Sequence, residues 1–150
     1  MGLLTVARDL TRRKARERSG LFVAEGIRTV EELLASPLRI SGALTCDLLD
    51  RTPRGAALAA ALHARDVQVL RVSEREFLSA CDTEHPQGVL AVAERPAASL
   101  NGMTLGSDAR LLVLDGIQDP GNLGTLLRTA AALGVDATCV LPGTVDPWNA

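Results

Sequence analysis

The sequence predicts an α/β fold, in which helices cover both faces of a mostly parallel sheet, followed by a second and shorter α/β segment. Apolar runs with strand character alternate with amphipathic stretches along the chain, which is typical of layered α/β folds. A stretch near residue 100 contains proline and glycine and lacks periodicity, and it separates two such series. With 150 residues, 47% of them hydrophobic, the chain can bury one good core and the start of a second.

The first series is expected to form one domain over residues 1–93. Its first helix is polar, and Ser19-Gly20 provides a stop signal after it. Ser73 followed by Glu76 is a capping-box pattern, which predicts the start of a short helix. In order, the sequence predicts a helix over 5–18, a strand at 21–23, a helix over 26–36, a strand over 40–46, a helix over 54–65, a strand over 67–72, a helix from 73 and a strand over 89–93.

The second series follows a linker that we expect over residues 94–109. It comprises a strand over 110–115, a helix over 122–133 that closes at Gly134, and a strand over 137–141. Two strands and one helix are too few to cover an apolar sheet by themselves. Residues 110–150 are therefore expected to be the beginning of a truncated domain.

The formal charge of −2 conceals a basic segment near the start of the chain. Only Asp9 and Glu17 oppose its six cations, which are Arg8, Arg12, Arg13, Lys14, Arg16 and Arg18. Local positive potential can bind nucleic-acid phosphates whatever the net charge, although such a segment is equally compatible with a solvated helix face. Aromatic residues make up 2% of the chain, which argues against RNA recognition by base stacking.

Metal and membrane binding are not expected. Cys46, Cys81 and Cys139 are far apart, and neither His63 nor His85 lies near enough in sequence to complete a zinc site. No apolar run approaches the roughly 18 residues of a membrane span, and the start lacks a signal-peptide pattern. These features favour a reducing, cytoplasmic location.

The strongest candidate site is the turn between the strand over 110–115 and the helix that follows. A helix that begins near Gly121 offers free amides to an anion and places Gly121, Gly124, Thr125 and Arg128 on one face. A substrate backbone could approach the two glycines closely, and Arg128 could meet a phosphate or an oxyanion. In a structural interpretation, the glycines serve packing, Arg128 is a solvated charge and Asn122 is an N-cap.

Two nucleotide-binding patterns fit this turn poorly. A P-loop ends in Gly-Lys followed by Ser or Thr, whereas Gly121 precedes Asn122 and Leu123. The dinucleotide fingerprint needs three spaced glycines, and here Gly121 and Gly124 are present without the first one.

At these residues the chain resembles the SpoU (TrmH) type of RNA ribose 2'-O-methyltransferase. Asp119-Pro120, Asn122, Gly124 and Arg128 are similar to the family's first signature motif. Arg13-Lys14-Ala15-Arg16, followed by Phe22-Val23-Ala24-Glu25-Gly26, resembles the opening of its substrate-binding module, and residues 85–92, His-Pro-Gln-Gly-Val-Leu-Ala-Val, resemble its close.

The resemblance implies a ribosomal-protein-like α/β/α N-terminal domain over 1–93 and, over 110–150, the incomplete first part of an α/β-knot (SPOUT) methyltransferase domain. It also implies methylation of a ribose 2'-hydroxyl in structured RNA, either rRNA or tRNA, with S-adenosyl-L-methionine as cofactor and a homodimer as the working form. The cofactor pocket is expected in the missing C-terminal part, so that this chain alone would be inactive.

The resemblance assigns catalysis to Arg128 and Asn122. Because a guanidinium stays protonated in proteins, we expect Arg128 to stabilise an oxyanion or a phosphate rather than act as a base, while Asn122 orients the turn or the ribose. The candidate RNA contacts are Arg13, Lys14, Arg16, Arg28, Gly121 and Gly124. A non-catalytic RNA-binding module is the main alternative, and a small-molecule enzyme that binds phosphate at the Gly121 turn is a third.

Overall fold

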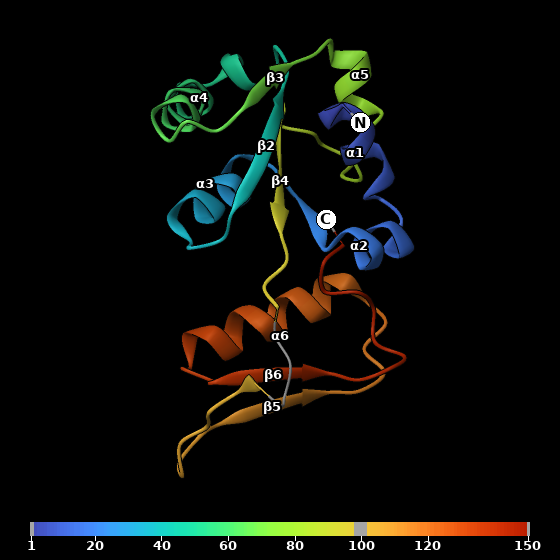
Figure 1. Cartoon of the computed structure of the whole chain (residues 1–150), viewed down its shortest axis with the longest axis vertical. Helices are drawn as coiled ribbons and strands as arrows, with labels where there is room; N and C mark the ends of the chain where they lie inside the picture. Colours follow the sequence, from blue (N-terminus) through green and yellow to red (C-terminus); the bar gives the residue numbers. More distant parts are fainter. Residues whose placement is uncertain (1, 98–101, 150) are drawn as a thin grey trace. The chain divides into compact units, whose positions relative to one another are not determined.

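The computed structural model describes residues 2–97 and 102–149, which form two compact units. Unit 1 comprises residues 1–96 together with 148–150, and unit 2 comprises residues 97–147 (Figure 1). Part of the expected linker, residues 98–101, lies outside the described residues.

Unit 1 contains most of the predicted elements at nearly the predicted places. Both halves of the capping box are present at Ser73 and Glu76, as the spacing predicted. The elements are α1 (Leu3–Asp9), α2 (Arg13–Ser19), β1 (Leu21–Glu25), α3 (Ile27–Ala35), β2 (Ile40–Thr45), the 3-10 turn η1 (Leu49–Arg51), α4 (Pro53–Ala64), β3 (Val69–Arg71), α5 (Glu74–Leu78) and β4 (Val89–Glu94).

The sheet of unit 1 has the strand order β1-β4-β2-β3, and only β2 and β3 are parallel. The central strand β4 runs antiparallel to both β1 and β2, so the prediction of a mostly parallel sheet was wrong. The reason is that β4 is buried on both faces, from Val89 to Ala93, and therefore has the continuous apolar sequence that is typical of parallel strands. Burial, rather than strand direction, determines that pattern.

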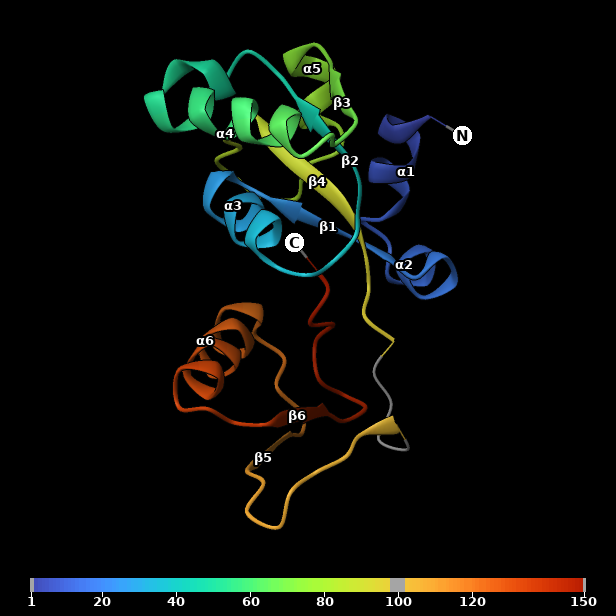
Figure 2. The same ribbon diagram turned by 60° about the vertical axis from the view of Figure 1, so that its left-hand side comes forward.

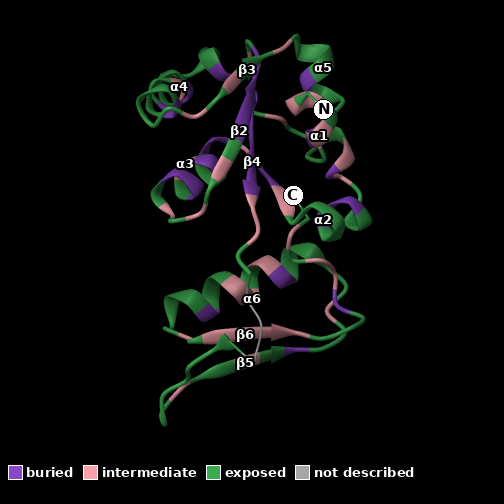
Figure 3. Ribbon diagram, viewed as in Figure 1, coloured by how far each residue is buried: buried purple, intermediate pink, exposed green. Residues whose placement is uncertain are grey.

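Helices cover both faces of this sheet, as the sequence predicted. One apolar cluster joins the sheet to α3 and α4 and includes Val30, Leu58 and Leu62. A second cluster on the other face includes Ala7 of α1 and Phe77 of α5. Figure 2 shows α3 and α4 on one side of the sheet and α1 on the other, and Figure 3 shows the buried residues concentrated along β4 and the inner face of α3.

The basic N-terminal segment forms two helices instead of the single helix predicted over 5–18. The chain turns at Leu10, whose side chain is buried in the second cluster. The Thr11 hydroxyl donates to the Arg8 carbonyl at 2.9 Å, and the Arg16 guanidinium donates to the carbonyls of Leu10 and Thr11 at 2.7 and 2.9 Å. These bonds satisfy the carbonyl groups where α1 ends and stabilise the break.

Unit 2 consists of β5 (Leu111–Leu114), α6 (Pro120–Ala132) and β6 (Ala137–Val140), with β5 and β6 parallel. Leu114 of β5 and Leu123 and Ala130 of α6 are buried, whereas Leu111 and Val113 are 49% and 57% exposed. Leu133, which follows the last residue of α6, is 64% exposed.

Among the described residues, no helix is both long and apolar enough to cross a bilayer.

Candidate functional site

The turn before α6 is capped by Asp119. Its carboxylate Oδ1 accepts a hydrogen bond from the amide of Asn122 at 2.6 Å, and its carbonyl accepts from the amide of Leu123 at 3.0 Å. Pro120 occupies the first helical position, where its lack of an N–H costs nothing. The Asp119 carboxylate therefore already occupies the Asn122 amide, one of the helix N-terminal amides that the sequence predicted to be free for a substrate anion.

Asn122 is not the N-cap that the structural interpretation suggested. It is the third residue of α6, it is exposed, and its side chain makes no hydrogen bond to any residue in the ranges that the structure describes. Its side-chain carboxamide is therefore available to a ligand, which is compatible with the orienting role that the resemblance implied.

The structure brings Gly121, Gly124, Thr125 and Arg128 to one exposed face of α6, as their spacing predicted. The Thr125 hydroxyl donates to the Gly121 carbonyl at 2.9 Å and accepts from Nη2 of Arg128 at 3.2 Å. Nη1 of Arg128 would lie only 3.0 Å from a Cβ atom built on Gly124. The guanidinium thus folds back along the helix and lies over the bare backbone at Gly124.

Thr144 anchors the loop that leads into this turn, a role that sequence reasoning missed. Its buried hydroxyl donates to the Leu114 carbonyl and accepts from the Ile117 amide, both at 3.3 Å. The Val145 amide donates to the Ile117 carbonyl at 2.7 Å. A threonine within a Pro-Gly-Thr loop carries no sequence signal for such a contact, because its partners lie about 30 residues earlier in the chain.

Among the predicted RNA contacts on α2, Arg16 is buried and cannot reach RNA from the surface. Its side chain is buried, at 3% exposed, where it donates to the carbonyls of the α1–α2 turn. Arg13 is exposed and pairs with Glu17 at 2.8 Å, and Lys14 is exposed without an ion pair among the described residues. We therefore correct the assignment of Arg16 from an RNA ligand to a structural residue.

The two motifs that resemble the substrate-binding module meet where β1 ends and β4 begins. The buried carboxylate of Glu25 accepts from the Asp82 amide at 3.1 Å and from the Thr83 hydroxyl. The Gln87 side chain caps α3, since its Oε1 accepts from the Ile27 amide at 2.8 Å. These motif residues therefore have structural roles that hold the segment 82–88 against the start of α3.

Burial raises the pKa of three ionisable groups of unit 1. The pKa of Asp82 is raised above its ordinary value, mainly by burial and to a smaller extent by the Glu25 carboxylate. The same two causes raise the pKa of the Cys81 thiol, which therefore stays protonated. Burial also raises the pKa of the Cys46 thiol, so both of these cysteines favour the protonated, less nucleophilic form.

Arg28 lines an open hollow of about 520 Å³ at the start of α3, together with Thr29, Thr83 and His85. Its guanidinium is exposed and pairs with Glu32 at 3.2 Å. Glu25 and Glu84 also line the hollow, which reduces its positive potential. This is the most spacious of the hollows described, and it contains one of the predicted RNA contacts.

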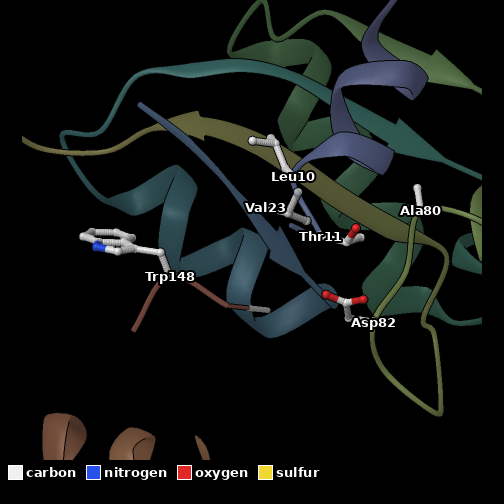
Figure 4. Close-up of a pocket in the computed structure, with 6 residues that line it drawn as sticks. All are labelled: Leu10, Thr11, Val23, Ala80, Asp82 and Trp148. Atoms are coloured by element: carbon white, nitrogen blue, oxygen red, sulfur yellow. The ribbon is translucent and has the colours of Figure 1, made fainter. Parts of the chain in front are cut away.

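A smaller cavity in unit 1, about 10 Å³ in volume, can hold no more than one water molecule. Figure 4 shows the six residues that line it, Leu10, Thr11, Val23, Ala80, Asp82 and Trp148. It is too small to be a ligand site. Within the described residues there is also no cluster of three or more His, Cys, Asp or Glu that could hold a metal ion.

The fold and the turn define a mixed α/β protein of the SpoU and TrmH structural class. Residues 109–150 match the model of the SpoU rRNA Methylase family, and residues 6–91 match the MRM3-like substrate binding domain. The chain belongs to the SpoU rRNA methylase family and carries an MRM3-like substrate-binding domain.

Several curated relatives align along nearly the whole chain. The 23S rRNA (guanosine(2553)-2'-O)-methyltransferase RlmP of Bacillus subtilis is 34% identical over 142 residues, which cover 95% of this chain and 52% of that protein. The mitochondrial rRNA methyltransferase 3A of Danio rerio is 34% identical over 146 residues, covering 91% of this chain and 31% of that protein. The chain thus spans about half, or less, of the length of these relatives.

Solved structures agree with the family assignment. An rRNA methyltransferase from Sinorhizobium meliloti has a TM-score of 0.77 at 29% identity, and the match covers 98% of this chain and 54% of that one. An AdoMet-bound rRNA methyltransferase from the same organism gives the same values. The SpoU methyltransferase AviRb of Streptomyces viridochromogenes, with a TM-score of 0.78 at 22% identity, supports the fold alone.

Proposed function

We propose that the complete protein to which this chain belongs transfers a methyl group from S-adenosylmethionine to a ribose 2'-hydroxyl of ribosomal RNA. The observation that carries this proposal is the α6 turn, where Arg128 is held on an exposed helix face in a segment that matches the SpoU rRNA Methylase family. The names of the relatives favour rRNA over tRNA as the substrate.

The residues of unit 2 do not by themselves fit the cofactor. A bound S-adenosylmethionine needs enclosing walls, whereas the sheet residues Leu111 and Val113 are about half exposed. We propose that the pocket is formed by the part of the complete protein that corresponds to the remaining half of its relatives. When bound, the cofactor supplies an electrophilic methyl group on a sulfonium.

In this proposal Arg128 stabilises negative charge. A ribose hydroxyl is a poor nucleophile until its proton leaves, and the oxygen then carries charge that a fixed cation can stabilise. A guanidinium offers only N–H donors, so Arg128 donates to that oxygen or to an adjacent phosphate. Asn122 lies one to two turns earlier on the same helix, and its side-chain carboxamide orients the ribose.

RNA binding by unit 1 is proposed to use exposed cations. Arg13 and Lys14 of α2 offer charge to phosphates, and Arg28 does so beside the hollow at α3. Gly121 is exposed and allows a nucleic-acid backbone to approach, whereas the face of Gly124 is covered by Arg128. A homodimer as the working form is part of the same proposal.

The test measures transfer of labelled methyl groups from S-adenosylmethionine into total RNA. It compares this chain, the complete gene product, and the complete product with Arg128→Ala. We expect activity in the complete product alone and a loss of about 100-fold or more with Arg128→Ala, the scale of removing a preorganised charge partner. Intact RNA binding without methyl transfer by any version would favour the alternative, a non-catalytic RNA-binding module.

A further inference from the structure

We infer that Thr125 is a positioning residue, which holds the guanidinium of Arg128 against the bare backbone at Gly124. The inference rests on the proposed role of Arg128 and extends it to two neighbours on the same helix face. Neither Thr125 nor Gly124 would touch the reacting atoms. They would act by fixing where the Arg128 charge lies before RNA arrives.

The hydrogen bonds leave little freedom in how the Thr125 hydroxyl is used. A hydroxyl has one proton, and at Thr125 this proton points to the Gly121 carbonyl at 2.9 Å. The oxygen can then only accept, and the nearby guanidinium can only donate. The contact of 3.2 Å between Nη2 of Arg128 and Oγ1 of Thr125 therefore pairs a donor with an acceptor. It links Arg128 to the helix backbone through the Thr125 side chain.

Gly124 provides the space that this arrangement needs. Glycine inside a helix is destabilising because it loses more backbone freedom than alanine, so its presence in the middle of α6 requires a compensating advantage. A Cβ at this position would lie 3.0 Å from Nη1 and 3.7 Å from both Cζ and Nη2 of Arg128. A methyl group would push the guanidinium outward, away from the Thr125 hydroxyl.

Fixing Arg128 matters because its side chain is long and exposed. A free arginine samples many rotamers and must lose that freedom when it binds a charged oxygen. A guanidinium already held at one place donates at less entropic cost, which lowers the barrier of the step that needs it. The expected effect of releasing it is moderate, about threefold to tenfold in rate, because one exposed hydrogen bond is lost.

The experiment measures single-turnover methyl transfer and RNA affinity for four variants of the complete protein. Thr125→Val removes the hydroxyl and keeps the shape, Thr125→Ser restores the hydroxyl, Gly124→Ala fills the space under the guanidinium, and Arg128→Ala removes the charge. Unfolding temperatures identify any variant that is merely unstable. We expect Thr125→Val and Gly124→Ala to slow transfer about threefold to tenfold at unchanged RNA affinity, and Thr125→Ser to retain the normal rate.

A double variant separates positioning from a general structural role. If Thr125 acts through Arg128, Thr125→Val has no further effect once Arg128→Ala is present. Full activity of Thr125→Val, while Arg128→Ala is impaired, would overturn the inference and leave the proposed function standing. Full activity of Arg128→Ala would overturn both the inference and the catalytic role of Arg128. An equal loss in Thr125→Ser and Thr125→Val would also refute it, because the hydroxyl would then be irrelevant.

Discussion

Replacing Arg16 with methionine removes a buried cation while keeping most of the apolar stem. In the folded protein the guanidinium donates to the carbonyls of Leu10 and Thr11 at 2.7 and 2.9 Å. A hydrogen bond to a charged group contributes roughly 1.5–3 kcal/mol, and the cost of burying the cation offsets part of the sum of two such bonds. We expect Arg16→Met to lower the free energy of unfolding by about 3 kcal/mol.

The assay monitors the urea unfolding of unit 1 by far-UV circular dichroism. RNA affinity is measured in parallel at several salt concentrations. Lys14→Met is the matched control, because it introduces the same residue at an exposed position of α2. Arginine, lysine and methionine have similar helix propensities, so backbone preference cancels in the comparison. Lys14→Met should change stability by no more than about 0.5 kcal/mol.

Only Lys14→Met should weaken RNA binding. Loss of a phosphate contact reduces the slope of log affinity against log salt concentration by about one. We expect this reduction for Lys14→Met, and we expect no reduction for Arg16→Met when binding is measured on the folded variant. An Arg16→Met protein as stable as the wild type, with weaker and less salt-dependent RNA binding, would refute the reasoning. Arg16 would then be a surface ligand, as its sequence context suggested.

Three further predictions concern stability. Gly88→Ala should cost more than about 3 kcal/mol by urea unfolding, because residue 88 has φ +78° and a Cβ there would lie 2.3 Å from the Leu49 amide nitrogen. Asp119→Ala should cost about 1 kcal/mol of local helix stability, detected as faster hydrogen exchange in the first turn of α6. Burial and Glu25 raise the pKa of Asp82 in the folded state, so the folded protein binds this proton more tightly than the unfolded chain. The stability gained by Asp82→Asn should therefore be largest above the raised pKa and should shrink as pH falls toward 3.8, the ordinary pKa of an aspartate. A gain independent of pH would contradict the assignment.

Much of the fold could be predicted because local sequence determines local structure. The capping box at Ser73 and Glu76 and the spacing of Gly121, Gly124 and Arg128 need only neighbouring residues, and the structure has both. The strand positions were also predicted, since apolar runs must be buried. The sequence even contained an unused signal for the N-cap, because Pro120 at the first helical position marks Asp119 as the residue before it.

Long-range features could not be predicted in the same way. The direction of β4 depends on its neighbours, and its apolar sequence is the same for either direction. Arg16 has the same charge as Arg13, and only the path of the chain at Leu10 decides that one is buried and the other exposed. The positions of Thr125 against Arg128 and of Thr144 against Leu114 likewise depend on side-chain contacts that spacing alone does not give.

The position of β4 determines when unit 1 can fold during synthesis. This strand is the last of the unit in sequence, yet it separates β1 from β2 in the sheet, and those two strands are not paired with each other. A nascent chain that has emerged only as far as α5 can pair β2 with β3, but β1 has no partner and the cap of α3 at Gln87 is absent. Nearly the whole unit must therefore leave the ribosome before its long-range contacts can close, which makes its folding a late and cooperative event.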